Sequence, residues 1–222
     1  TVNGGAAQVA VVSARALAEA GYNIYFVFAA GTPAQELIHE NITLVDLEQY
    51  DLLNNPSKVN ASIIGIWNND VASKTKKLLA QFSPENTIIH IHTWVKSLSN
   101  SFLHAVIESK FPHVITLHDY FSVCPNGGFY NFQSKNICTL KPMSYQCLKS
   151  NCDLRSYSQK LWRFTRQAVT YRLGVPRKVS NYIYVSEFSK KILSPYFSDT
   201  STLWNVPNPI DVKKLSRATP DL

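Results

Sequence analysis

Three histidines that end or follow short apolar runs are the residues best suited to acid–base chemistry. His90 and His92 lie in the segment HIHTW, and His118 directly precedes Asp119 in TLHDY. Side chains two residues apart on a strand share a face, so His90 and His92 should point the same way. Ligands of open α/β sheets bind outside the carboxyl ends of the strands, where Thr93, His118 and Asp119 would lie. We expect His118, beside a carboxylate, to orient a hydroxyl group or transfer a proton, and His90 to be an ordinary half-buried, hydrogen-bonded histidine.

All four cysteines, Cys124, Cys138, Cys147 and Cys152, fall within one loop-rich stretch. Four thiols satisfy the ligand count of a tetrahedral structural zinc site. The intervening segments of 13, 8 and 4 residues contain no C-x2-C pair, so the spacing matches common zinc modules only loosely. Two disulfides, which a reducing compartment disfavours, and four unrelated thiols are the alternatives. We expect a structural zinc ion here that stabilises the loop and takes no part in catalysis.

The turn Asn3-Gly4-Gly5-Ala6 stands immediately before a long helical pattern. Glycines let the backbone approach a ligand closely, and a helix N-terminus favours an anion such as a diphosphate. The turn is not the G-x-G-x-x-G fingerprint of dinucleotide-binding domains. An ordinary tight turn is the simpler interpretation of this segment when it is taken alone.

Most of the net charge of +7 comes from one segment. Residues 141–178 hold nine basic side chains against Asp153 alone, whereas residues 1–140 carry eight basic and ten acidic ones. A local cationic patch can meet nucleic acid, anionic lipid headgroups or a phosphorylated substrate. A solvated helix face is the alternative interpretation of the same charges.

Hydrophobic periodicity and turn signals divide the chain into alternating helices and strands. Helices are predicted over residues 6–20, 33–40, 71–82, 98–110, 156–173 and 187–196, and strands over 23–29, 42–47, 62–69, 88–93, 113–119, 182–186 and 202–209. In the helix at 156–173, Tyr157, Leu161, Phe164 and Ala168 are spaced for one apolar face. Residues 50–60 are expected to form a loop, and residues 121–153 an irregular insertion that contains the cysteines. This alternation predicts an α/β fold with a Rossmann-like, doubly wound, mostly parallel sheet.

The two ends of the chain suggest a piece of a longer protein. The chain starts at Thr1 without Met, and the first predicted helix lacks the preceding strand that a Rossmann-like domain would have. The proline-rich turn VPNPID at 206–211 suggests that the chain leaves the sheet there. We therefore expect one domain over residues 1–211, followed by a linker or tail over 212–222. No apolar run reaches the roughly 18–20 residues that a membrane-spanning helix needs.

Five segments in this order resemble the N-terminal domain of a family 4 glycosyltransferase, a retaining enzyme of GT-B fold. They are NGGAAQVAVVSARALAEAGYNIYFVF, IIHIHTW, VITLHDYFSVCPNG, YIYVSEFSKKIL and VPNPID. The stretch CLKSNCDLRSYSQKLWRFTR is similar to the Cys-containing loops of a bacterial subgroup. The resemblance implies two Rossmann-like halves with the active site between them. The N-terminal half would bind the acceptor, and the C-terminal half would bind the nucleotide-sugar donor and carry an E-x7-E motif.

The resemblance also implies roles for individual residues. Gly4 and Gly5 would lie beside the donor diphosphate, and His118 would face the transferred sugar as the catalytic residue. The cleft would be lined by His92, Asp119 and Ser186. The crossing to the second domain would be marked by Asn208 and Asp211. Such enzymes generally need no metal for catalysis, so zinc would be structural. Because the donor half is not part of this chain, we expect the chain alone to be inactive.

The partners implied by the resemblance are a nucleotide-diphosphate sugar as donor and a glycan or lipid-linked sugar as acceptor, as in cell-envelope polysaccharide synthesis. We expect a cytoplasmic protein, peripheral at the inner face of the membrane, that contacts anionic lipid through residues 141–178. Trp162 and Phe164 would then be interfacial residues.

Two alternatives stay open from the residues alone. A zinc-stapled basic module for nucleic acid or anionic surfaces fits the net charge and the cysteines, but no usual nucleic-acid motif is visible, so we expect no nucleic acid. Another Rossmann-like enzyme, such as a sugar-nucleotide dehydrogenase or epimerase, would need the G-x-G-x-x-G motif that is absent.

Overall fold

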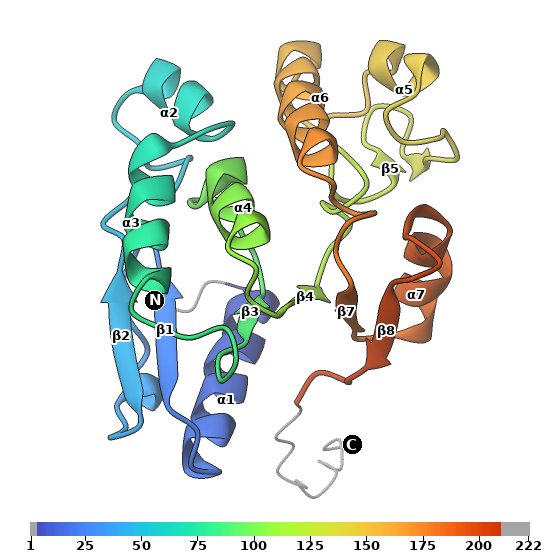
Figure 1. Ribbon diagram of the computed structural model, residues 1–222. Helices are drawn as coiled ribbons and strands as arrows, with labels where there is room; N and C mark the ends of the chain where they lie inside the picture. The colour runs from blue at the N-terminus through green and yellow to red at the C-terminus, as the bar shows by residue number, and fades with distance from the viewer. Residues whose placement is uncertain (1–3, 210–222) are drawn as a thin grey trace, which may run out of the picture.

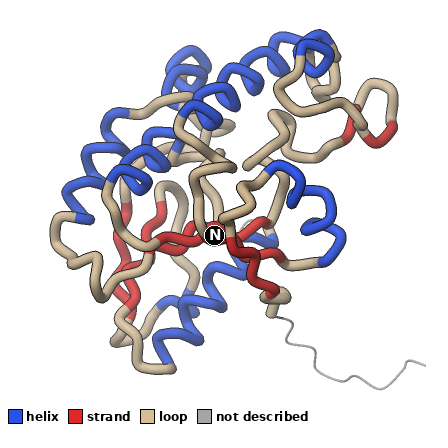
Figure 2. The backbone as a smooth tube through the Cα atoms, turned by 45° about the vertical axis from the view of Figure 1, so that its right-hand side comes forward, coloured by secondary structure: helices blue, strands red, loops and turns tan. Residues whose placement is uncertain are grey.

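The computed structural model describes residues 4–209, which form an α/β domain with parallel strands between helices (Figure 1). Figure 2 shows the strands, in red, with helices, in blue, above and below them. The fold class predicted from the sequence is therefore confirmed. Asn3, Asp211 and the predicted tail at 212–222 lie outside the described residues, and the predicted domain boundaries stay predictions.

The strands form two parallel sheets that are not hydrogen-bonded to each other. In the first sheet, β1 (Ile24–Phe28) pairs with β2 (Ile42–Asp46). The second sheet has the order β3 (Ile89–Ile91), β4 (His113–Leu117), β7 (Asn181–Tyr184) and β8 (Thr202–Asn205). Along the chain β2 separates β1 from β3, but in space no strand of residues 4–209 fills the gap between β1 and β3, so the single predicted sheet is divided in two (Figure 1).

Helices cover both sheets, and most of them begin at a polar side chain. The α-helices of the described chain are α1 (Gly5–Glu19), α2 (Lys58–Ile64), α3 (Asn69–Leu79), α4 (Ser99–Glu108), α5 (Tyr145–Lys149), α6 (Tyr157–Arg172) and α7 (Glu187–Leu193), and the 3₁₀ helices are η1 (Gln35–Leu37) and η2 (Ser194–Tyr196). N-caps from Ser57, Asn68, Ser144, Ser156 and Ser186 accept hydrogen bonds from backbone N–H groups that the helices leave unpaired. Among these described helices, none is both long enough and apolar enough to cross a bilayer.

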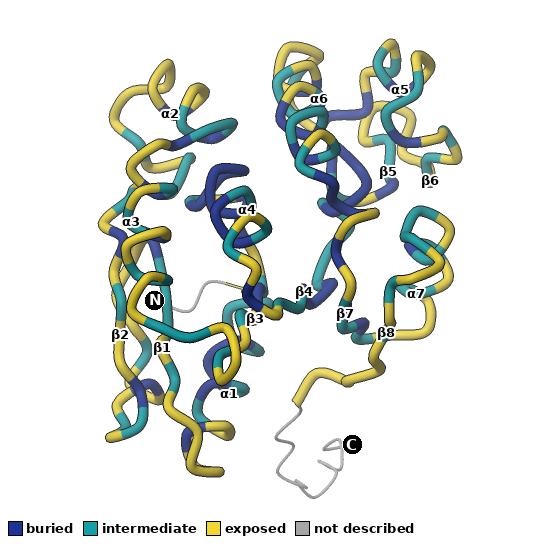
Figure 3. The backbone as a smooth tube through the Cα atoms, in the orientation of Figure 1, coloured by how far each residue is buried: buried dark blue, intermediate teal, exposed yellow. Residues whose placement is uncertain are grey.

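The core is shared by the two sheets, although their strands do not pair. Leu103 and Val106 of α4 and Ile115 of β4 are almost fully buried in it, and Val27 of β1 and Val45 of β2 pack against the same cluster. Figure 3 shows α4 largely in dark blue and α2 mostly in yellow, so α4 is a central helix and α2 an outer one. The packing of buried side chains across the gap thus holds β3 and β4 in a fixed place relative to β1 and β2.

The strand predicted at residues 62–69 is wrong, because this apolar run belongs to α2 and to the turn before α3. Ser57 starts α2 by accepting a hydrogen bond from the N–H of Asn60, and Gly65 ends it. A Cβ on Gly65 would lie 2.8 Å from the carbonyl oxygen of Ala61 and 2.8 Å from the Trp162 ring. Short apolar runs fit a strand and a helix equally well, and the contact with a tryptophan a hundred residues away is invisible in the local pattern.

Helix α6 buries polar side chains instead of the apolar face predicted from the sequence. Of the predicted face, Tyr157 and Leu161 are exposed and Phe164 and Ala168 are half-buried, whereas the buried residues of the helix are Lys160, Arg166, Gln167 and Thr170. The buried side chain of Asn100 joins α4 to this face, because its Nδ2 donates to the carbonyl oxygen of Arg166 and its Oδ1 accepts from Thr170. Polar groups are stable in such a place only when they are hydrogen-bonded, and periodicity does not reveal their partners.

Residues 121–153, here called the cysteine segment, contain more regular structure than predicted. The strands β5 (Tyr130–Asn131) and β6 (Asn136–Ile137) pair in a short antiparallel hairpin, and α5 follows them. The segment lies against α6, where the side chain of Arg163 contacts both Asp153 and Asn126.

Candidate active site

Polar residues that follow β3, β4 and β7 meet at one edge of the second sheet. Parallel pairing of Ile91 with Ile115 places His92 and His118 just beyond the carboxyl ends of neighbouring strands. Leu117 pairs with Tyr184, so Ser186 lies at the same edge, where it caps α7 and accepts a hydrogen bond from the N–H of Ser189. The sequence predicted this common edge from the strand ends alone.

Three histidines stack at this edge, and we call them the histidine stack. Nδ1 of His92 lies 3.0 Å from Nε2 of His118, and the two rings are stacked with centroids 5.3 Å apart. The ring of His90 lies against that of His92, with centroids 4.1 Å apart, so the two side chains share a face as expected. His90 is hydrogen-bonded through Nε2 to Oγ1 of Thr116 at 2.7 Å, although it is more exposed than we expected.

The environment of the stack keeps His92 and His118 neutral at neutral pH. Burial, with repulsion from the charges that His90 and His118 could carry, lowers the pKa of His92 to about 3. Burial and then His90 likewise lower the pKa of His118. Nδ1 of His118 makes no hydrogen bond to any described residue, so it is the nitrogen that His118 has left for a ligand.

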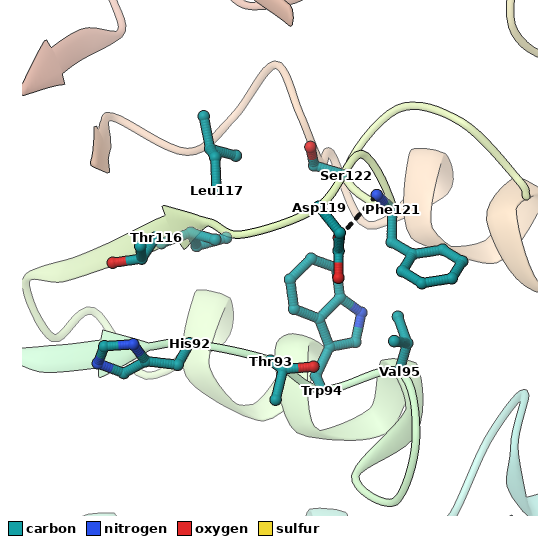
Figure 4. A pocket seen from close by; sticks show the side chains of 10 residues that line it. His92, Thr93, Trp94, Val95, Thr116, Leu117, Asp119, Phe121 and Ser122 are labelled. Atoms are coloured by element: carbon teal, nitrogen blue, oxygen red, sulfur yellow. Dashed lines mark hydrogen bonds between the residues drawn. The ribbon is translucent and has the colours of Figure 1, made fainter. Parts of the chain in front are cut away.

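Asp119 faces away from the histidine stack. Its Oδ1 accepts a hydrogen bond of 2.9 Å from the N–H of Phe121. Figure 4 shows the carboxyl group of Asp119 beside the indole of Trp94, with the ring of His92 pointing away from both. His118 and Asp119 therefore do not form a hydrogen-bonded histidine–carboxylate pair among the described residues. Burial raises the pKa of Asp119, and the Phe121 N–H, Arg166 and Lys96 oppose this rise.

A cavity of about 10 Å³ lies beside Asp119 (Figure 4). This volume holds about one water molecule or hydroxyl group. Trp94 and Ser122 line it, and within residues 4–209 the buried Nε1 of Trp94 and Oγ of Ser122 have no hydrogen-bond partner. The residues around this small cavity therefore include an indole donor, a hydroxyl group and the Asp119 carboxyl group.

Arg166 is a buried neighbour of this cavity that the sequence placed only in the basic segment. Its Nη1 donates to the carbonyl oxygen of Val95 at 3.4 Å, and its guanidinium lies 5.0 Å from the ring centre of Phe121. Val95 and Phe121 both line the cavity. Burial lowers the pKa of Arg166 to about 10, so the group stays charged at neutral pH. The signal that could have found it is the three-residue spacing of Lys160, Arg163 and Arg166 on one helix face.

Gly4 and Gly5 form an open start of α1. Gly4 has φ +104°, a left-handed conformation that strongly favours glycine, and it caps the helix without a side-chain hydrogen bond. A Cβ at either position would have no atom of the described chain within 4 Å, so residues 4–209 leave both positions uncrowded. Figure 1 shows the start of α1 close to β3, although no described side chain joins the glycines to the histidine stack.

The predicted four-cysteine zinc site is not supported by the structure. Nζ of the fully buried Lys160 lies 3.4 Å from Sγ of Cys147 and 3.3 Å from Sγ of Cys152, so an ammonium group occupies the position between them. Cys138 follows β6, and its N–H bonds to the carbonyl oxygen of Phe129. Within residues 4–209 no group of three or more His, Cys, Asp or Glu residues could hold a metal ion, and the four thiols, Cys124 included, are free. The zinc-stapled binding module predicted as an alternative loses its support with this site.

An α/β domain with polar side chains gathered beyond parallel strands, and with an open helix start, is a Rossmann-like ligand-binding domain. The family model described as Glycosyltransferase Family 4 matches residues 3–214. The chain therefore belongs to glycosyltransferase family 4, and the family resemblance noted from the sequence is confirmed. Comparison with curated proteins and with solved structures gave no significant match.

Proposed function

We propose that this domain is the acceptor-binding half of a retaining GT-B glycosyltransferase of bacterial type. The enzyme moves a sugar from a nucleotide-diphosphate sugar to a glycan or a lipid-linked sugar, and a second domain binds the donor. The observation that carries the proposal is the free Nδ1 of a neutral His118 at the carboxyl edge of a family 4 domain. The proposed transfer requires no metal.

His118 acts as a hydrogen-bond partner of the transferred sugar. Because its pKa is lowered, the imidazole is neutral at pH 7 and is a poor general acid there. Its Nε2 is held by His92, so the ring is fixed in orientation, and its Nδ1 has no partner in the described chain. A sugar hydroxyl bound to this nitrogen would be oriented without the cost of ordering the ring.

The cavity beside Asp119 receives one hydroxyl group of the acceptor. The hydroxyl would donate to the Asp119 carboxyl group and accept from Nε1 of Trp94, which has no partner among the described residues. Supplying a partner to a buried donor is favourable by about 1–3 kcal/mol, which gives the acceptor a reason to bind there.

Gly4 and Gly5 bind the donor diphosphate through the start of α1. The unpaired N–H groups of the first helical turn and the helix dipole both favour an anion. No atom of residues 4–209 lies within 4 Å of a Cβ at either glycine, which leaves room for a phosphate group among the described residues.

Peripheral contact with an anionic membrane through residues 141–178 is part of the same proposal, as is the cytoplasmic location. Lys160 and Arg166 are buried, so these two side chains do not take part. Trp162 and Phe164 are half-buried and stay the interfacial residues of the proposal, with Nε1 of Trp162 donating to the carbonyl oxygen of Ser62. Exposed residues such as Arg155 and Arg172 would make the contact.

The proposal is tested by transfer of labelled sugar from a panel of nucleotide sugars to lipid and glycan acceptors, using the protein together with its donor domain. His118→Gln should lose transfer, while Lys76→Met, an exposed change on α3, should keep it. Full transfer by His118→Gln, or failure of every donor in the panel, would contradict the proposal. Flotation with neutral and anionic vesicles tests the membrane contact, and equal binding to both would argue against it.

A further inference from the structure

The basic residues of 141–178 divide into two groups that the sequence did not distinguish. One group makes contacts inside the fold, with sulfur atoms, a carboxylate or a carbonyl oxygen. It comprises Lys160, Arg163 and Arg166. These three residues explain part of the local excess of charge, because they bind α6 to the cysteine segment.

Three cations of the other group, Lys141, Arg177 and Lys178, line one cavity of about 440 Å³. Among the described residues, none of their side chains makes a hydrogen bond, an ion pair or a ring contact. No acidic residue lines this cavity, and it shares no lining residue with the cavity beside Asp119. Its volume is within the range of about 300–1,000 Å³ that is typical of small-molecule sites. We call it the cationic pocket.

Segments that are distant in the sequence build the pocket. Lys141 comes from the cysteine segment, Arg177 and Lys178 from the connection between α6 and β7, and Tyr196 from η2 (Figure 1). The side chain of Lys178 lies against Gly174, where a Cβ would come within 2.4 Å of it. Gly174 has φ +101°, so both its conformation and its missing side chain are needed for Lys178 to lie there. The cations are thus brought together by the fold and not by chance on an open surface.

Two tyrosines complete the wall with neutral hydroxyl groups. Burial raises the pKa of Tyr171 to about 12, with the charge of the nearby Arg177 opposing the rise, so the phenol keeps its proton. The hydroxyl of Tyr171 donates to the carbonyl oxygen of Val123 at 3.1 Å. The hydroxyl of Tyr196 has no hydrogen bond within the described chain and is free to donate to a ligand. The wall therefore offers donors and positive charge without an acidic acceptor.

We propose that the cationic pocket binds a ligand through a phosphate or diphosphate group. Three unpaired cations in one concave site repel one another, and a ligand with two or more negative charges removes this repulsion. The planar guanidinium of Arg177 suits the paired oxygens of phosphate, and the two lysines supply further charge. This site goes beyond the proposed acceptor and donor sites, and its existence does not depend on them. The phosphate belongs either to a soluble molecule or to a lipid headgroup.

The test is titration of the full chain with pyrophosphate, followed by calorimetry. The pocket variant carries Lys141→Met, Arg177→Met and Lys178→Met, and the matched control carries Lys58→Met, Lys76→Met and Lys77→Met at exposed positions of α2 and α3. The pocket variant should bind pyrophosphate at least about tenfold more weakly than the wild type, because charge-assisted hydrogen bonds are lost. The control should bind as the wild type does. Equal weakening of both variants, or unchanged binding by the pocket variant, would overturn the proposal.

A second arm separates the two sources of phosphate. Flotation uses vesicles of phosphatidylcholine alone and of phosphatidylcholine with phosphatidic acid, with and without pyrophosphate as competitor. A lipid ligand predicts flotation that requires phosphatidic acid, is abolished in the pocket variant and is reversed by pyrophosphate. A soluble ligand predicts pyrophosphate binding without flotation. Absence of binding to pyrophosphate and to both vesicles would refute the site, and Tyr196→Phe, which changes no charge, should weaken whichever binding is found.

Discussion

Nδ1 of His92 lies 3.0 Å from Nε2 of His118, so a single proton joins two rings on neighbouring strands. Protonation of both rings would remove this hydrogen bond and place two positive charges side by side. Burial is the main cause of the low pKa of His92, and repulsion from charge on His90 and then on His118 adds to it.

Acid should destabilise the domain through His92. The unfolded chain binds a proton at this histidine near pH 6.5, whereas the folded chain does so only near pH 3. Folding stability from this group is therefore complete above about pH 6.5 and is lost progressively as the pH falls toward 3. His92→Gln should reduce the loss of unfolding free energy between pH 7 and pH 4 by about 3 kcal/mol. Urea denaturation at several pH values measures this difference. The same dependence of the unfolding free energy on pH in the variant and the wild type would contradict the low pKa of His92.

The unpartnered hydroxyl of Ser122 should make alanine the better residue for stability. Oγ of Ser122 is buried and has no hydrogen-bond partner among the described residues, so Ser122→Ala should raise the unfolding free energy by about 1 kcal/mol. Ser101 is the matched control, because its Oγ is equally buried but donates to the carbonyl oxygen of Asn68 at 2.6 Å. Ser101→Ala should therefore destabilise the domain. Urea denaturation measures the unfolding free energy of both variants. A loss of stability in Ser122→Ala would mean that the Ser122 hydroxyl makes a hydrogen bond in the folded protein.

Close packing of α6 on α2 predicts a strong effect of a single methyl group at Gly65. Gly65→Ala would bring a Cβ within 2.8 Å of the Trp162 ring and should lower the unfolding free energy by about 1–3 kcal/mol. Gly128→Ala is the control, because the nearest atoms to its Cβ would lie at ordinary contact distances of 3.9 and 4.0 Å. Equal melting temperatures for the two variants would show that α6 yields at this contact.

The sequence predicted most of the helices and strands, but it predicted few of the contacts between side chains. Most of the strands and helices, and the edge where His92, His118, Asp119 and Ser186 gather, follow from local periodicity and from the rule for parallel sheets. The histidine stack could be foreseen only in part, since spacing places His90 and His92 on one face but does not pair His92 with His118 across two strands.

Burial of charge explains the larger errors. Arg166 and Lys160 were counted as surface charge, and four cysteines were counted as metal ligands, because residue type is a good guide to location only on average. The carbonyl partner of Arg166 lies 71 residues away in the chain, beyond any local window. The thiol partners of Lys160 lie only 8 and 13 residues away, but hydrophobic periodicity does not show that a lysine and two cysteines meet. For the same reason, the buried polar face of α6 was predicted to be exposed, since polar residues are exposed on average.

The contact of Lys160 with two thiols predicts an unusual ranking of variants. The ammonium is fully buried, and its hydrogen-bond acceptors among the described residues are the sulfur atoms of Cys147 and Cys152. Lys160→Met removes a buried charge and leaves thiols that need no partner, so stability should stay within about 1 kcal/mol or rise. Replacing both cysteines by valine leaves the ammonium without an acceptor and should cost about 3 kcal/mol. The triple variant should recover this loss.

Denaturation in reducing buffer measures the three Lys160 and cysteine variants. If Lys160→Met proves the most damaging of them, the ammonium pairs with a thiolate and stabilises the fold. Lys149→Met serves as control, since this side chain is exposed and contacts only the ring of Tyr145.

Removal of the Arg163 charge should destabilise the domain, in contrast to removal of the Lys160 charge. The reason is that the partner of Arg163, Asp153, is a buried anion. The side chain of Asp153 is fully buried and lies 3.1 Å from Nε of Arg163, whose Nη1 also donates to Oδ1 of Asn126 at 2.7 Å. Arg163→Met would leave a carboxylate buried without a cation and should lower the unfolding free energy by about 3–5 kcal/mol. Adding Asp153→Asn should restore part of this loss, because the amide needs no counter-charge. Arg172→Met, on an exposed side chain without a partner in the described chain, should change stability by less than about 0.5 kcal/mol. If Arg163→Met lowers the unfolding free energy as little as Arg172→Met does, then contacts other than this ion pair hold the cysteine segment to α6.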